Sequence, residues 1–153
     1  MRERSFRWFV RLTFGAVALA AFAIPCAAVE RPFKLQGTTM VLGNPFSPAG
    51  AAMQGSGTAT HLGRWTNTGL IFFDGSSGPP FAATAIVHFI AANGDHLEIL
   101  LNGEVDASFV TEATYYIVGG TGRFADASGS GDFSAHPNPD GTLSYTAEGT
   151  IDY

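Results

Sequence analysis

The chain has 153 residues, of which 46% are hydrophobic and 14% are charged, and its formal net charge at pH 7 is −5. A chain of this length has room for one domain with its own core. The acidic balance makes nucleic acids and anionic membrane surfaces poor partners, because both carry charge of the same sign.

The first 28 residues have the layout of a secretory signal peptide. Four arginines accompany an apolar segment over residues 12–24, and Cys26-Ala27-Ala28 supplies small residues for cleavage. An uncleaved membrane anchor is the alternative, but the apolar segment is shorter than the roughly 20 residues of a membrane-spanning helix. We therefore expect a signal helix in 1–28 and a single exported domain in 29–153, periplasmic or extracellular, without stable membrane insertion.

Removal of the signal segment would change the chemistry of the domain. Four basic and twelve acidic residues remain, which corresponds to a net charge of −8. The only cysteine, Cys26, is removed as well, so the exported domain has no disulfide. Its stability must come from burial and from a closed ladder of backbone hydrogen bonds.

From residue 30 onward, glycine, threonine and alternating apolar and polar positions predict an all-β domain without helices. In chain order we expect strands over residues 33–42, 57–73, 81–91, 95–102, 108–118, 127–135 and 142–153. The segment 57–73 is either two strands or one strand bent at a glycine. The last strand alternates throughout, which predicts one buried face and one exposed face.

Seven or eight sequential strands joined by short turns favour an antiparallel up-and-down meander. Closing this meander into an eight-stranded barrel removes the exposed strand edges. The interior of such a barrel is just wide enough for packed side chains or for one small ligand. A two-sheet sandwich is the alternative architecture.

Asn93-Gly94 is the clearest turn signal, because this pair favours a two-residue hairpin loop. Such a loop would place Ala92 opposite Asp95. His88 would then share a face with five aliphatic residues: Ile86, Ile90, Leu97, Ile99 and Leu101. We therefore expect His88 either as a hydrogen-bonded core histidine or as a polar group that orients a ligand in a cavity.

Tyr145 and Tyr153 lie on the apolar face of the last predicted strand. Residues of this type are core aromatics that find a partner for the hydroxyl group, or else they line a pocket. Together with His88 they are the candidate ligand-binding residues, and no catalytic residue is identified. His96 and Glu98 share a strand face but provide only two ligands, so no metal site is expected.

A glycine-rich motif ends the strand that precedes it. Residues 117–127 read Ile-Val-Gly-Gly-Thr-Gly-Arg-Phe-Ala-Asp-Ala, and we expect Gly119, Gly120 and Gly122 to permit a turn and Phe124 to plug the core. The spacing Gly120-x-Gly122-x-x-Ala125 also matches a dinucleotide-binding fingerprint. No helix follows it to hold a pyrophosphate, so no nucleotide cofactor is expected.

The same motif resembles the Val-Val-Gly-Gly-Thr-Gly-x-Phe-x-x-Ala segment of plant dirigent proteins, and allene oxide cyclases have a similar corner. The chain from residue 29 is similar to an exported bacterial member of that superfamily. The resemblance implies an eight-stranded, calycin-like antiparallel barrel with an apolar central cavity, often assembled as a trimer. Dirigent proteins continue the motif with arginine, where this chain has Ser128, so a charged group associated with their pocket is absent.

Three functions are compatible with these observations. The first, which we favour, is an exported barrel that binds a small apolar or aromatic ligand. The second is a cyclase- or dirigent-like enzyme, which would need an acid or base inside the barrel; Glu98, Glu104 and Asp106 are the charged residues nearest the hairpin. The third is a structural or cell-surface interaction domain with a filled barrel, so the state of the interior discriminates among the three.

Overall fold

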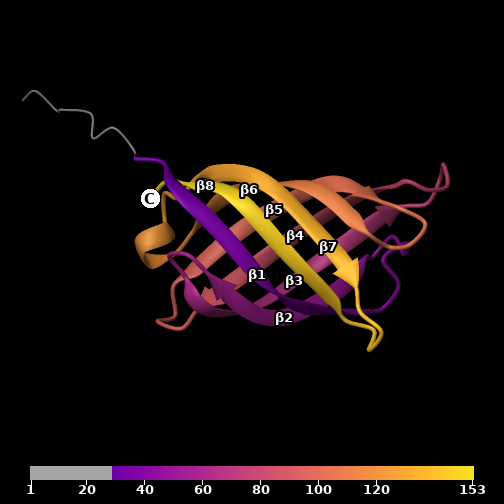
Figure 1. The fold of residues 1–153 in the computed structure, drawn as a ribbon, viewed down its shortest axis with the longest axis horizontal. Helices are drawn as coiled ribbons and strands as arrows, with labels where there is room; N and C mark the ends of the chain where they lie inside the picture. The colour runs from indigo at the N-terminus through magenta and orange to yellow at the C-terminus, as the bar shows by residue number, and fades with distance from the viewer. Residues whose placement is uncertain (1–28) are drawn as a thin grey trace, which may run out of the picture.

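Eight antiparallel strands form a closed barrel in the computed structural model, which describes residues 29–153 (Figure 1). The predicted signal segment, residues 1–28, lies outside the described residues. Each strand pairs with the next along the chain, and the last pairs with the first. The strands are β1 (Arg31–Leu42), β2 (Ala51–Ala59), β3 (Gly63–Asp74), β4 (Phe81–Ala91), β5 (His96–Val105), β6 (Thr111–Gly120), β7 (Gly129–Pro137) and β8 (Leu143–Ile151). The prediction of an all-β, closed eight-stranded barrel is confirmed, and the two-sheet sandwich is wrong.

The predicted strand over residues 57–73 is two strands, β2 and β3, joined by a tight turn at residues 60–62. His61 and Gly63 have φ values of 68° and 69° in this turn. The first half of β2 had no clear strand signal, because residues 51–56 include no β-branched or aromatic side chain. Pairing with β1 and β3 on both sides nevertheless makes it a strand.

The β4–β5 hairpin has a different register from the one predicted. The Gly94 amide donates to the Ala91 carbonyl at 2.9 Å, Gly94 has a φ of 89°, and the Ala91 amide donates to the Asp95 carbonyl. This is a three-residue loop with a left-handed glycine, whereas Asn93-Gly94 suggested a two-residue loop. The additional residue shifts the pairing by one position, so that Ile90 faces His96 and His88 faces Glu98.

A one-residue shift reverses which residues of the two strands share a face. The side chains of β4 and β5 that point into the barrel include Ala83, Ala85, Val87, Phe89, Ala91, Leu97, Ile99, Leu101 and Val105. His88 lies on the outer face with Glu98, and about 45% of its side chain is exposed. The expectation of His88 among Leu97, Ile99 and Leu101 is therefore wrong.

Glycines on the inner barrel face make room for two large aromatic side chains. A Cβ atom at Gly37 or Gly57 would collide with the indole of Trp65, which is 3% exposed. A Cβ atom at Gly131 or Gly149 would likewise meet the ring of Tyr115, which is 1% exposed. The two aromatic rings fill the middle of the barrel because the glycines next to them have no side chain on the inner face.

The glycine motif closes one end of the barrel, which we call the plugged end. Glu98 pairs with Gly119 and Ile99 with Ile117, so a β-bulge interrupts β6 at this point. Gly119 and Gly122 have φ values of 133° and 60°, and the 3-10 helix η1 (Gly122–Phe124) follows. Phe124 is fully buried. The predicted roles of the glycines as a turn and of Phe124 as a plug are confirmed.

Candidate interior cavity

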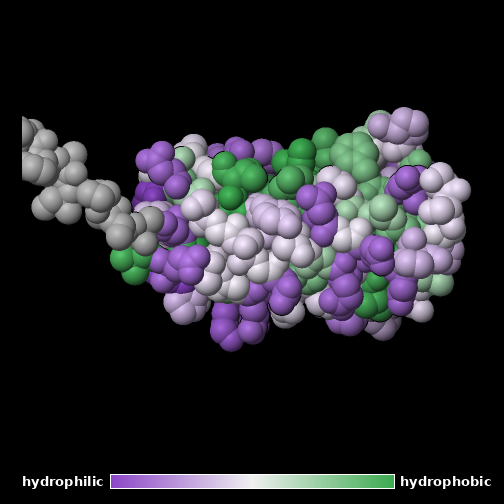
Figure 2. Space-filling view, turned by 90° about the horizontal axis from the view of Figure 1, so that it is seen from above, coloured by the Kyte–Doolittle hydropathy of each residue, from purple (hydrophilic) through white to green (hydrophobic). Residues whose placement is uncertain are grey.

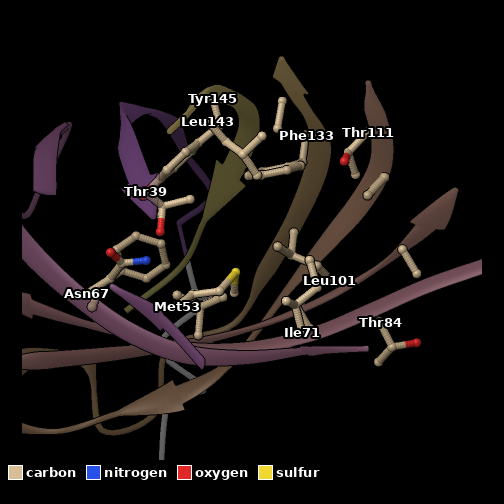
Figure 3. Close-up of a pocket in the computed structure, with 16 residues that line it drawn as sticks. Thr39, Met53, Asn67, Ile71, Thr84, Leu101, Thr111, Phe133, Leu143 and Tyr145 are labelled. Carbon is tan, nitrogen blue, oxygen red and sulfur yellow. The ribbon is translucent and has the colours of Figure 1, made fainter. Parts of the chain in front are cut away.

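A cavity of about 50 Å³ lies in the half of the barrel farther from η1 (Figure 3). Every strand contributes to its wall, and most of the labelled side chains in Figure 3 lie around a common central space, with Thr84 farther away at the edge of the view. Sixteen residues line it: Thr39, Met53, Asn67, Ile71, Ala83, Thr84, Ala85, Val87, Phe89, Leu101, Thr111, Ala113, Phe133, Ala135, Leu143 and Tyr145. The interior is therefore filled near the plugged end, and a small cavity remains toward the other end.

The wall of this cavity is mostly apolar and carries no charged side chain. Among the residues that line it there is no carboxylate, histidine, lysine or arginine. The buried polar residues of the described chain, Thr39, Asn67 and Thr111, all line the cavity. An apolar wall with a few convergent polar groups is typical of a site for a small molecule.

Asn67 and Tyr145 each present a buried polar atom that has no protein partner. Asn67 is 4% exposed and Tyr145 is 5% exposed. Within the described residues, the Asn67 Oδ1 atom and the Tyr145 hydroxyl make no hydrogen bond. Burial raises the pKa of the Tyr145 phenol well above its ordinary value, so this hydroxyl stays protonated and remains a hydrogen-bond donor. Both atoms are enclosed by surrounding protein atoms, and Asn67 Oδ1 lies on the side of Gly55.

The end of the barrel opposite η1, which we call the loop end, has a second space of about 270 Å³, which we call the mouth groove. Its wall includes Phe73, Phe109 and Pro137, and the loops of residues 43–50, 106–110 and 138–142 surround it. Thr111 and Leu143 line both this mouth groove and the interior cavity. The two spaces are therefore neighbours, and an apolar surface leads from the solvent to the cavity wall.

The structure separates the three residues predicted as ligand contacts. Tyr145 lines the cavity. Tyr153 lies at the plugged end, where its hydroxyl and His61 Nδ1 are 3.1 Å apart and its ring packs on Phe124. His88 is outside, and its Nδ1 atom lies 3.4 Å from Glu98 Oε1. Only Tyr145 is at the cavity, and its binding of a ligand stays a prediction.

The acidic residues considered for catalysis also lie outside the barrel. Glu98 faces solvent beside His88, and Glu104 faces Glu112 across β5 and β6. The Asp106 carboxylate accepts hydrogen bonds from the Ser108 and Val110 amides, at 2.8 and 2.9 Å, in an exposed turn. None of the three can act on a molecule inside the cavity.

Sequence reasoning missed Asn67, which lies within the polar run Thr66-Asn67-Thr68. A polar run of this kind suggests an exposed segment. The informative signal is strand alternation, because Trp65, Asn67 and Ile71 share one face of β3 and Trp65 and Ile71 are core residues. Asn67 is thus a polar residue on an otherwise apolar inward face.

The outside of the barrel carries an apolar row across four adjacent strands. Leu70, Ile86, Leu100 and Tyr116 face one another in sequence from β3 to β6, and we call them the outer apolar row. Leu70, Ile86 and Tyr116 are 44–47% exposed. The space-filling view shows hydrophobic side chains gathered together beside a largely polar surface (Figure 2).

In residues 29–153, no three histidine, cysteine, aspartate or glutamate side chains lie close enough together to hold a metal ion. No helix within this part of the chain is long and apolar enough to span a membrane. The fold and site together define a closed antiparallel barrel with a small, uncharged interior cavity. The sequence matches no protein-family model and none of the curated proteins with which it was compared.

Proposed function

We propose that the protein is an exported β-barrel that binds a small apolar or aromatic molecule in its interior. The cavity beside Asn67 and Tyr145 is the observation that carries this proposal. Burying an apolar molecule against its wall gains free energy in proportion to the apolar area removed from water. The buried polar side chains on the wall, Thr39, Asn67 and Thr111, can orient a bound molecule.

The size of the cavity limits what this ligand can be. Small-molecule sites in proteins usually enclose about 300–1,000 Å³. An interior cavity of about 50 Å³ holds only a few non-hydrogen atoms. The ligand is therefore very small, or it is elongated and extends past Thr111 and Leu143 into the mouth groove.

A cyclase- or dirigent-like enzyme is the second candidate, and it has less support. Steering a reactive intermediate by shape requires the same cavity, together with an acid or base inside it. Glu98, Glu104 and Asp106 are outside, and the Tyr145 phenol is held neutral by burial. The cavity wall favours binding over proton transfer.

Native mass spectrometry of the protein purified from its own host tests the binding function. We expect a retained molecule that is released on denaturation. An Ala135→Leu variant, which projects extra volume into the cavity, should lose this molecule, whereas Ala52→Leu on the outer face of β2 should retain it. Protein that is free of ligand from every preparation, and that takes up no apolar molecule afterwards, would refute the proposal.

We also propose that the outer apolar row is covered by further copies of this chain, as a homo-oligomer. A trimer is the state that the resemblance implies. The row lies on β3 to β6, whereas the outward residues of β7 and β8 are polar, so one side of the barrel is suited to association. Leu100→Glu should convert the assembly to monomers in light-scattering measurements, and Thr146→Glu on the polar side should not.

Membership of the allene oxide cyclase and dirigent-like superfamily is part of the same proposal. The closed eight-stranded barrel and the glycine motif of residues 117–127 support it. Export to the periplasm or the medium rests on the arginine-rich and apolar composition of residues 1–28. N-terminal sequencing of the protein from these fractions should give a mature chain that starts near residue 29, and a chain that keeps Met1 would contradict this.

A further inference from the structure

The loop between β5 and β6 holds a phenylalanine in a backbone conformation that favours glycine. Phe109 has a φ of 62°, a left-handed value that bulky residues rarely adopt. Two backbone hydrogen bonds define the loop: the Phe109 amide donates to the Asp106 carbonyl at 3.0 Å, and the Asp106 amide donates to the Val110 carbonyl at 2.9 Å. The geometry of this loop therefore requires a left-handed residue at position 109.

Two other hairpin loops of the barrel have the same geometry with glycine at that position. In the β7–β8 loop the Gly141 amide donates to the Asn138 carbonyl, the Asn138 amide donates to the Thr142 carbonyl, and Gly141 has a φ of 83°. Gly94 occupies the equivalent place in the β4–β5 loop, with the same two kinds of hydrogen bond. Glycine adopts this conformation without a steric cost, so the loop geometry does not explain Phe109.

The side chain of Phe109 lies at the mouth groove. It is 49% exposed and lines the groove together with Phe73 and Pro137. A residue held in an unfavourable backbone conformation is a reason to consider function, because such residues cluster at sites that bind ligands. Phe109 therefore presents an aromatic ring to the groove at a cost that the other two hairpins avoid.

The mouth groove is also large enough for an aromatic ring, whereas the interior cavity is not. A cavity of about 150 Å³ suffices to bind benzene. The groove encloses about 270 Å³ and the interior cavity about 50 Å³. Thr111 and Leu143 line both spaces, so a short substituent on a ring in the groove can extend toward the interior.

The surroundings of the groove favour a neutral ligand over an anion. No charged side chain lines the groove. The three loops around it, residues 43–50, 106–110 and 138–142, contain two charged residues, and both are acidic: Asp106 and Asp140. An anion in the groove would lose hydration without meeting a positive charge.

We propose that the mouth groove binds the aromatic ring of a neutral molecule, and that Phe109 determines this specificity. Aromatic pairs gain attraction beyond the burial of their area, which an aliphatic ring of similar size does not provide. This inference rests on the proposed binding function and adds to it the class of ligand and the place where its ring is held.

Titration calorimetry on the protein purified from its host tests this inference with three probes: 3-phenyl-1-propanol, 3-cyclohexyl-1-propanol and 3-phenylpropanoate. Phe109→Leu keeps an apolar side chain but removes the ring, so it should lower the ratio of phenyl to cyclohexyl affinity about 2- to 12-fold. At pH 7, 3-phenylpropanoate should bind about 10-fold more weakly than the phenyl alcohol, or weaker still. Equal binding of these two phenyl compounds would overturn the preference for a neutral ligand.

Two further variants separate recognition from folding. Phe109→Gly installs the residue that the other two hairpins use, so its thermal midpoint should equal or exceed that of the parent while its affinity for 3-phenyl-1-propanol falls at least about 2-fold. Phe72 alternates with the inward-facing Ile71 and Phe73 on β3 and does not line the groove. The control variant Phe72→Leu should therefore leave the affinity for 3-phenyl-1-propanol unchanged.

The outcomes distinguish this inference from the binding function beneath it. Unchanged affinities in both Phe109 variants would overturn the role of the groove, and loss of the same binding in Ala135→Leu would then assign it to the interior cavity. A Phe109→Gly variant that melts lower but binds as tightly as the parent would show that the phenylalanine serves the fold. If none of the probes binds the parent, the inference fails, whereas a molecule retained in native mass spectrometry would still support the binding function.

Discussion

Replacing Phe124 by alanine tests whether the glycine motif is an architectural plug. The side chain is fully buried at the plugged end, where it packs on Tyr153 with ring centroids 5.1 Å apart. A buried aromatic side chain removes about 150–250 Å² from water, and at about 25 cal/mol/Å² this amounts to about 4–6 kcal/mol. Measured Phe→Ala costs in protein cores are about 3–5 kcal/mol, so we expect the free energy of unfolding to fall by about 4 kcal/mol.

Urea unfolding and thermal melting measure this loss. With a denaturant slope of about 2 kcal/mol/M, the urea midpoint should fall by about 2 M. The unfolding entropy of residues 29–153 is about 0.26 kcal/mol/K, so the melting temperature should fall by about 15 °C. Val118→Ala in the same motif, at a side chain that is 58% exposed, should change stability by less than about 0.5 kcal/mol. A Phe124→Ala variant as stable as this control would refute the plug.

Two further predictions concern the packed interior and its ionisation. Gly37→Ala should lower the free energy of unfolding by about 1–3 kcal/mol in urea titrations, because the added methyl group meets the Trp65 indole. The control variant Thr58→Ala, on the outer face, should leave the free energy of unfolding nearly unchanged. Equal effects of the two substitutions would contradict close packing around Trp65. Stability should also fall as the pH rises above about 10, because unfolding releases the Tyr145 phenol to ionise while the folded protein keeps it protonated. Tyr145→Phe should reduce this dependence by up to about 1.4 kcal/mol per pH unit in unfolding titrations between pH 10 and 12, and an unchanged slope would show that the phenol is not protected.

Tyr115 contributes to the same alkaline dependence. Burial raises its pKa to about 12, because desolvation disfavours the ionised phenolate. Its folded pKa therefore lies above the value of about 10 for an unfolded tyrosine, and the stability it contributes is lost as the pH rises. The residual pH dependence of Tyr145→Phe should thus be smaller than that of the parent protein without vanishing.

Local chemistry made most of the fold predictable. Alternating residues and turn signals indicated the later strands closely, since a strand with one buried face shows a period of two in its sequence. The turn at the glycine motif was equally predictable, because positive φ values at Gly119 and Gly122 are a local requirement that glycine meets. Phe124 is the large apolar residue that follows these glycines. Strand β2 was harder to predict, because small and polar residues are ordered there only by their neighbours.

The candidate site was less predictable, because its residues come from different strands. The face occupied by His88 depended on a single residue in the hairpin loop, and Asn93-Gly94 is compatible with both loop lengths. Asn67 and Tyr145 are far apart in the chain, and they line the same cavity only because of the registers of β3 and β8 within the closed barrel.

The amino-acid sequence by itself determined the class of the domain, the number of its strands to within one, and the residue that plugs one end. These features follow from propensities and periodicities that act over a few neighbouring residues. Only the tertiary structure decided the register of the β4–β5 hairpin, that a small cavity remains inside the barrel, and which residues line this cavity. The volume left inside a barrel is a small difference between the space enclosed by all eight strands and the side chains that fill it, and no local pattern encodes that difference.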